Sequence, residues 1–216
     1  MFAKRTLCTC LVLCAALAGL TFSLQAQTGD GGRIVKIRED RPDLNFVGQY
    51  INSGPNSHQY GYISKIAGID NVFNSDAVKD ESTAMFTFST HAINVQVVNN
   101  GPLRAVNRIG TTTIYYHPEG GANFADPSSF EAGIPIQVSD YEQTVNLAPA
   151  VAFPFITTHL NTITETDSFT LNGQKLRLGN VHDAFRTHYL GTANTGTPPP
   201  TGYFVGYAVG VSREQK

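Results

Sequence analysis

SFTLNGQKLRL, residues 168–178, contains the strongest turn signal of the chain. Asn172-Gly173 lies between two runs in which apolar and polar residues alternate, and this dipeptide predicts a two-residue type I′ turn. The turn pairs Phe169 with Leu176 on one face, while the residues between them pair on the opposite, polar face. We therefore expect an antiparallel hairpin with one apolar face.

The same period of two continues through most of the chain, which is typical of β-strands. Short turns join most of the alternating runs, and this predicts antiparallel pairing between neighbours. We expect an all-β fold: a strongly coiled antiparallel sheet that closes into a small barrel, with a β-sandwich as the alternative. The runs lie near 34–38, 46–51, 59–66, 84–98, 103–116, 134–147, 155–171, 174–178, 184–190 and 203–211.

Helical signals are confined to one segment. Asp126 can cap a helix that Pro127 begins and Gly133 ends, so we predict one short helical turn near 126–133. This turn belongs to the connection 117–133, and connections of such length are usually functional or disordered. Its two aromatic residues, Phe124 and Phe130, are candidates for lining a ligand cavity at one rim of the barrel, or else they plug one end of the core.

In the strand that begins at Thr83, the apolar residues change from even to odd positions. Phe86 and Phe88 share one face, whereas the apolar residues at positions 93, 95 and 97 fall on the other. Strand faces alternate strictly, so the apolar face stays inward only if one residue is inserted. We expect a bulge between Ser89 and Ala92, and we take His91, which would lie in it, as a candidate for lining the cavity.

The strand that approaches the hairpin supplies the candidates for chemistry. Its odd positions share the inward face of Phe169, which places His159, Asn161, Glu165 and Asp167 inside. Two inward carboxylates are costly unless they are paired, hydrated or functional. Glu165, Asp167 and His159 are therefore candidate catalytic groups, and Asn161 is a candidate for lining the cavity. Alternatively, the strand bends beside the carboxylates, and both lie at a solvated rim.

Local metal and cofactor motifs do not occur in this sequence. There is no His-x-His pair, no His-Glu-x-x-His helix and no Gly-x-Ser-x-Gly elbow. We therefore expect no metal site and no cofactor. A metal site assembled from distant strands stays open, because ligand spacing in a sheet need not be local.

The N-terminal residues predict export. Lys4 and Arg5 precede an apolar run near 11–20 that is too short for a membrane span, and small and polar residues follow. We expect residues 1–26 to be a cleaved signal peptide, 27–32 to be flexible and 33–216 to form a single domain. The protein is then secreted or periplasmic, without a membrane span or any cysteine in its mature chain.

Charge and composition limit the partners. The chain of 216 residues has a formal net charge of −2, and only 15% of its residues are charged. No Lys/Arg cluster occurs after the predicted signal peptide, so nucleic acid is a poor partner. Trp is absent, which disfavours a sugar-binding module built on aromatic platforms.

The closing run Gly202–Gly210 alternates large with small residues. Tyr203, Val205 and Tyr207 occupy one face, and the other face consists mostly of Gly and Ala. This run resembles the Gly-punctuated last strands of small exported barrels such as dirigent proteins and allene oxide cyclases. The resemblance covers one strand, carries no catalytic motif and implies architecture alone.

These patterns favour an exported barrel that binds a small hydrophobic molecule in its interior. One alternative is a cofactor-free isomerase, cyclase or hydrolase that uses the inward carboxylates. Another is a structural or adhesive surface domain with a filled core. The volume inside the barrel separates the first two functions from the third.

Cleavage after Ala26 predicts that the exported protein begins at Gln27 or within a few residues of it. Mass spectrometry of the protein collected outside the cytoplasm measures this end directly. Thiol reagents should label nothing in that form, because all three cysteines precede the cleavage site. An exported form that retains Cys14 would contradict the prediction.

Overall fold

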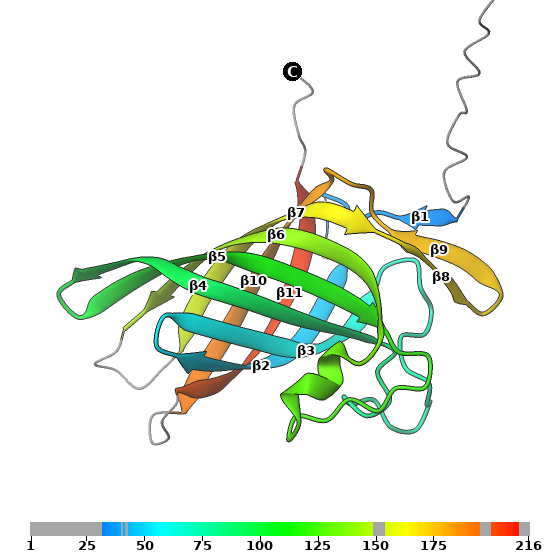
Figure 1. Ribbon diagram of the computed structural model, residues 1–216, viewed down its shortest axis with the longest axis horizontal. Coiled ribbons are helices and arrows are strands. Elements are labelled where there is room, and N and C mark those ends of the chain that lie inside the picture. Colours follow the sequence, from blue (N-terminus) through cyan, green and yellow to red (C-terminus); the bar gives the residue numbers. More distant parts are fainter. Residues whose placement is uncertain (1–31, 40, 42, 149–153, 195–199, 212–216) are drawn as a thin grey trace, which may run out of the picture.

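Eight antiparallel strands close into a barrel in the computed structural model, which describes residues 32–39, 41, 43–148, 154–194 and 200–211. The order around the barrel is β10-β11-β2-β3-β4-β5-β6-β7, and a separate three-stranded sheet has the order β1-β9-β8 (Figure 1). The expected all-β fold is confirmed, and the sheet closes as a barrel rather than a sandwich.

Most barrel strands pair with their neighbours in sequence, as short turns require. The strands of the small sheet are β1 (Arg33–Val35), β8 (Ser168–Leu171) and β9 (Gln174–Leu178). The barrel strands are β2 (Leu44–Ser53), β3 (Asn56–Ile66), β4 (Phe86–Asn100), β5 (Leu103–Tyr116), β6 (Ile134–Leu147), β7 (Phe155–Thr166), β10 (Ala184–Asn194) and β11 (Thr201–Val211).

The predicted hairpin forms as expected. Asn172 and Gly173 have φ values of 51° and 75°, as a type I′ turn requires, and Phe169 pairs with Leu176. The hairpin is β8–β9, however, and it lies outside the barrel wall because the chain leaves the wall after Thr166. The predicted continuous strand 155–171 is therefore two strands.

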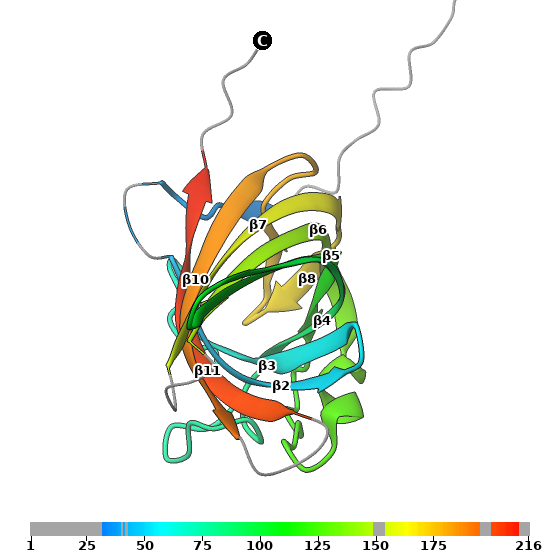
Figure 2. The same cartoon turned by 90° about the vertical axis from the view of Figure 1, so that its left-hand side faces the viewer.

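The β8–β9 hairpin covers one end of the barrel. Figure 2 looks into the barrel from the opposite end and shows β8 across the far opening. The Phe169 ring lies 5.4 Å from Phe86 and 5.0 Å from Tyr116, which belong to the wall at that end. The Tyr116 hydroxyl also donates to the Thr170 carbonyl (3.1 Å). The hairpin thus acts as an apolar plug.

A bulge in β7 overturns the inward placement of the two carboxylates. Ile163 pairs with Ser139, but Glu165 pairs with Val138, so Thr164 is an extra residue in β7. This insertion exchanges the two faces of the strand. Glu165 and, after the break, Asp167 are therefore exposed, and the prediction that they point into the barrel is wrong.

The bulge predicted near His91 lies elsewhere in β4. The pairing of β3 with β4 continues without a shift through His58↔His91, and β4 shifts against β5 at Val95. The apolar residues around Val95 are exposed, because this end of the β4–β5 hairpin extends past its neighbours (Figure 1). The predicted position of the bulge is wrong, and His91 lies on the outer face.

The predicted helical turn is confirmed as the 3-10 helix η1 (Pro127–Glu131), capped by a hydrogen bond of 3.1 Å from the Ser128 amide to Asp126. It packs against the outside of the wall rather than at the rim. Phe130 is fully buried against Tyr60, with ring centres 5.3 Å apart. The Phe124 ring lies 6.1 Å from that of Tyr60. Phe124 and Phe130 therefore do not line the interior, which corrects both predictions.

Within the described part of the chain, no helix has the length and apolar character needed to cross a membrane. The predicted signal peptide, its three cysteines and nearly all of the predicted flexible segment 27–32 lie outside the described residues.

Gly173→Val should destabilise the fold by roughly 1–3 kcal/mol, because a β-branched residue is strained at positive φ. A Cβ at this position would meet nothing within 4 Å, so the effect isolates backbone strain. Gly173→Asn is the matched control and should cost much less, since Asn tolerates this conformation. Urea unfolding of the three proteins measures the difference; equal midpoints would contradict the assignment of the turn.

Candidate functional site

The barrel interior contains a cavity of about 50 Å³, bordered by aromatic rings and by polar side chains of the wall. Rings and aliphatic groups form most of its surface, and amide, hydroxyl and imidazole groups complete it. The lining residues are Leu44, Phe46, Gln59, Ile63, Phe88, Thr90, Thr112, Ile114, Tyr141, His159, Asn161, Phe185, Thr187, Tyr189, Phe204 and Ala208.

The aromatic side of the cavity is built by pairing rings with glycines. Phe46 contacts Phe88 and Phe204 edge to face, with ring centres 5.8 and 6.2 Å apart. A Cβ on Gly48 would lie 2.4 Å from the Phe204 ring, and one on Gly206 would lie 2.8 Å from the Phe46 ring. These glycines therefore create the space that the rings occupy. The small-residue face predicted for the last strand has this role.

Gln59 is the centre of the polar layer. Its Oε1 accepts hydrogen bonds from the hydroxyls of Tyr189 (2.6 Å) and Tyr141 (3.1 Å). Its Nε2 donates to Gln143 Oε1 (3.3 Å). All four side chains are buried, so each bond replaces one that water would make in the unfolded chain.

Gln143 extends this network towards His159 and Arg108. Its Nε2 lies 3.1 Å from His159 Nε2 and donates to the Tyr189 hydroxyl (2.8 Å). The guanidinium of Arg108 donates to Gln143 Oε1 (3.2 Å). His159 Nε2 also lies 2.6 Å from the Thr157 hydroxyl. The network therefore fixes the orientation of the imidazole.

Burial keeps the imidazole and the two phenols of the network neutral. Burial lowers the pKa of His159 well below its usual value, and the positive charge of Arg108 acts in the same direction. Burial also raises the pKa of Tyr141 well above its usual value, and it raises that of Tyr189. At neutral pH the cavity thus presents a neutral imidazole and two protonated phenols, which are hydrogen-bonding groups rather than charges.

Two predicted site residues reach the cavity. His159 and Asn161 both line it, as the alternation of their strand predicts. Glu165 and Asp167 are exposed beyond the bulge, so the structure does not bring them to His159. Gln59, Tyr141 and Gln143 are not among the residues that the sequence predicts for the site. The alternation of side chains along each strand could have identified them, because each lies on the same face of its strand as apolar residues that point inward.

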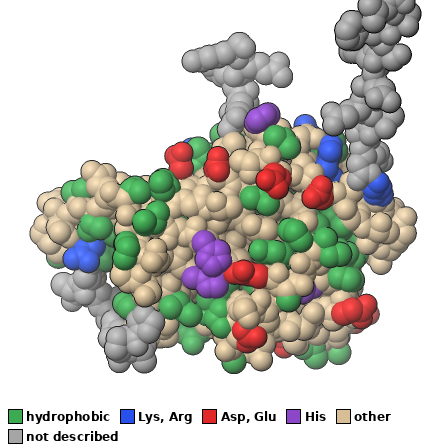
Figure 3. Space-filling model, viewed as in Figure 1, with side chains coloured by type: hydrophobic (Ala, Val, Ile, Leu, Met, Phe, Trp, Pro, Cys, Tyr) green, Lys and Arg blue, Asp and Glu red, His purple; other side chains and the backbone are tan. Residues whose placement is uncertain are grey.

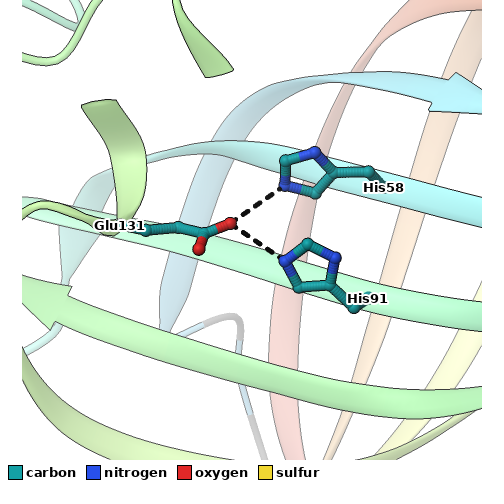
Figure 4. Close-up of side chains that lie close together, drawn as sticks. All are labelled: His58, His91 and Glu131. Carbon is teal, nitrogen blue, oxygen red and sulfur yellow. Dashed lines mark hydrogen bonds and ion pairs between the residues drawn. The ribbon is translucent and has the colours of Figure 1, made fainter. Parts of the chain in front are cut away.

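A second group of polar residues lies on the outer wall: His58 from β3, His91 from β4 and Glu131 at the end of η1 (Figure 4). Glu131 Oε1 lies 3.3 Å from His58 Nε2 and 2.9 Å from His91 Nε2. Among the described residues, these three are the group of His, Cys, Asp and Glu side chains that could hold a metal ion. Figure 3 shows His and carboxylate side chains gathered on this face.

Opposing effects set the pKa values of this outer group. Burial, together with the neighbouring His91, lowers the pKa of His58 despite the attraction of Glu131. Burial disfavours ionisation of Glu131, but hydrogen bonds from Ser89 and His91 outweigh it, so the pKa of Glu131 is lowered. His58 is therefore a neutral imidazole and Glu131 a carboxylate at neutral pH.

The lowered pKa of His159 makes stability depend on pH. The unfolded chain takes up a proton near pH 6.5, before the folded protein does, so the free energy of unfolding falls as the pH drops below that value. His159→Gln should reduce this slope by up to about 1.4 kcal/mol per pH unit, the contribution of one proton. Urea unfolding between pH 5 and 8 measures it.

Burial also lowers the pKa values of His58 and His117, so some slope should remain in the variant. Above about pH 7, where the histidines are neutral in both states, the two proteins should differ by a constant offset. An unchanged slope below pH 6.5 would contradict a buried neutral His159.

Comparison with known proteins found no relative of this chain. The chain matches no protein-family model, and searches of curated proteins and of solved structures likewise found no match.

Proposed function

We propose that this protein is exported and binds a small hydrophobic molecule inside its barrel. One observation carries the proposal: the interior contains a cavity with aromatic rings on one side and neutral hydrogen-bonding groups on the other. Binding sites for small molecules combine apolar walls with a few placed polar groups.

The volume limits what can bind. A cavity of about 50 Å³ has room for about three to five water-sized groups. Pockets that enclose drug-sized ligands measure roughly 300–1,000 Å³. The ligand is therefore compact, or it inserts one end, such as a short alkyl chain or a small ring, against the rings of Phe88 and Phe204 that line the cavity.

The polar lining limits the chemistry of the ligand. Asn161 and Thr187 line the cavity, and their only described bond to each other is long, at 3.4 Å. A carbonyl or hydroxyl group on the ligand could bond to these side chains. A charged ligand is disfavoured, because burial makes His159 and the two tyrosines neutral. We therefore propose a molecule with an apolar body and at most one neutral polar group.

The alternative, an enzyme that uses two inward carboxylates, is not supported, because Glu165 and Asp167 are exposed. A structural or adhesive domain remains the competing function. That function needs no ligand, so direct detection of one distinguishes the two.

Ala208→Leu tests the cavity, because Ala208 is fully buried and lines it. Three added carbon atoms should fill much of the space at a cost of about 1–3 kcal/mol. Val209→Leu is the matched control, since the next residue of a strand faces outward. Native mass spectrometry of protein purified from its source should find a small molecule on the wild type and the control, and none on Ala208→Leu.

A titration with benzene and p-cresol, followed by NMR, gives a second measurement that does not require the natural ligand. Resonances of Phe46 and Tyr189 should shift in a saturable way in the wild type and not in Ala208→Leu. A wild type that carries no molecule and does not respond to either probe would favour the structural domain.

A further inference from the structure

The outer wall of the barrel holds two histidines whose backbones the sheet fixes side by side. His58 and His91 are cross-strand partners of β3 and β4. Their rings stack with centres 4.4 Å apart and planes 11° apart, so both imidazoles present Nε2 in the same direction (Figure 4). Glu131 approaches from η1 and places one oxygen in front of both nitrogens. Three potential ligand atoms thus converge from three separate elements.

From this convergence we propose that His58, His91 and Glu131 bind a divalent transition-metal ion, with zinc as the preferred ion. Zinc bonds of about 2.0–2.2 Å place neighbouring ligand atoms of a tetrahedral site about 3.3–3.5 Å apart. The carboxylate oxygen lies 3.3 Å from one imidazole nitrogen and 2.9 Å from the other. All three atoms lie within 4.8 Å of one another. The two rings are stacked, however, so entry of the ion requires them to turn until both Nε2 lone pairs point at it.

The ligand types select the class of metal. Two imidazole nitrogens with one carboxylate suit zinc and other first-row transition ions. Calcium and magnesium prefer oxygen ligands, and this group offers a single carboxylate. The site should therefore discriminate against the alkaline-earth ions even where these are in large excess.

Ser89 supports the three ligands from beneath. It is buried, and its hydroxyl lies 2.8 Å from Glu131 Oε1 and 2.9 Å from His58 Nε2. It also lies 3.3 Å from His91 Nε2. A hydrogen bond that orients a ligating carboxylate raises the affinity of a metal site. The two contacts to Nε2 would give way to the ion, because each involves the atom that would bind it. Ser89 is a positioning residue that holds the carboxylate towards the imidazoles.

The site is open on one side. The side chain of His91 is 65% exposed, and both imidazoles border a surface groove of about 320 Å³. Three protein ligands leave one position of a tetrahedral ion for water or a small ligand, as in catalytic rather than structural zinc sites. The groove gives such a ligand access to the ion.

An ion here would also tie the connection 117–133 to the barrel. Glu131 belongs to that connection, whereas both histidines belong to the wall. The competing explanation is that the three side chains simply anchor the connection by hydrogen bonds, without any metal. The two explanations differ in whether the exchange of amide hydrogens in η1 responds to zinc.

The test uses the exported full-length protein after treatment with a chelator. Calorimetric titration with Zn²⁺ should give one site per chain with a Kd of micromolar order or tighter. His91→Gln, His58→Gln and Glu131→Gln should each weaken binding at least tenfold. His182→Asn is the matched control: it removes an exposed imidazole distant from the site, and Asn accepts its φ of 71°. Its affinity should equal that of the wild type.

Hydrogen exchange gives the second readout. Saturating Zn²⁺ should slow the exchange of amides in 128–131 in the wild type and in His182→Asn, but not in His91→Gln. Because His91 is exposed, its replacement should leave the fold intact, and the thermal midpoint without metal checks this. A millimolar excess of Ca²⁺ or Mg²⁺ should not displace the zinc.

Three results would overturn the proposal: no saturable zinc binding by the wild type, equal affinity in His91→Gln, or exchange in η1 that zinc leaves unchanged. None of these results bears on the interior cavity, which the Ala208→Leu experiment tests separately.

Discussion

The interior of an eight-stranded barrel is only wide enough for the side chains that fill it, and this limit governs the structure. Here the large rings lie opposite residues without side chains. Phe204 of β11 pairs with Gly48 of β2, and Gly206 pairs with Phe46. If both members of either pair carried large side chains, the wall could not close at its present diameter. The regular exchange of rings and glycines between neighbouring strands therefore fixes the closure and the position of the cavity.

The contents of the barrel change along its axis. The apolar β8–β9 plug covers one end (Figure 2), and the polar layer around Gln59 adjoins the rings in the cavity wall. Buried polar groups stabilise a fold only when they are satisfied, and the described contacts of Gln59, Gln143 and Tyr189 join them into one network. The cavity lies where rings and network meet.

Local patterns predicted the elements of this fold but not their register. The type I′ hairpin and the capped turn at Asp126 depend on residues adjacent in sequence, and both formed as predicted. The extra residue at Thr164 depends on how β6 and β7 pair, which no local pattern in β7 reveals. That single insertion moved Glu165 from the inside to the outside. His159, which precedes it, kept its predicted face, so the sequence identified part of the cavity and misplaced the acids.

The outer histidine pair was beyond such reasoning, because His58 and His91 meet only through the register of two long strands. That same register joins the two proposed sites. Gln59 and Thr90 are partners on the next rung of β3 and β4, and both line the cavity. Successive residues of a strand face opposite sides, so each strand gives one side chain to the outer group and the next to the interior. An ion bridging His58 and His91 would hold together the two strands that carry Gln59 and Thr90.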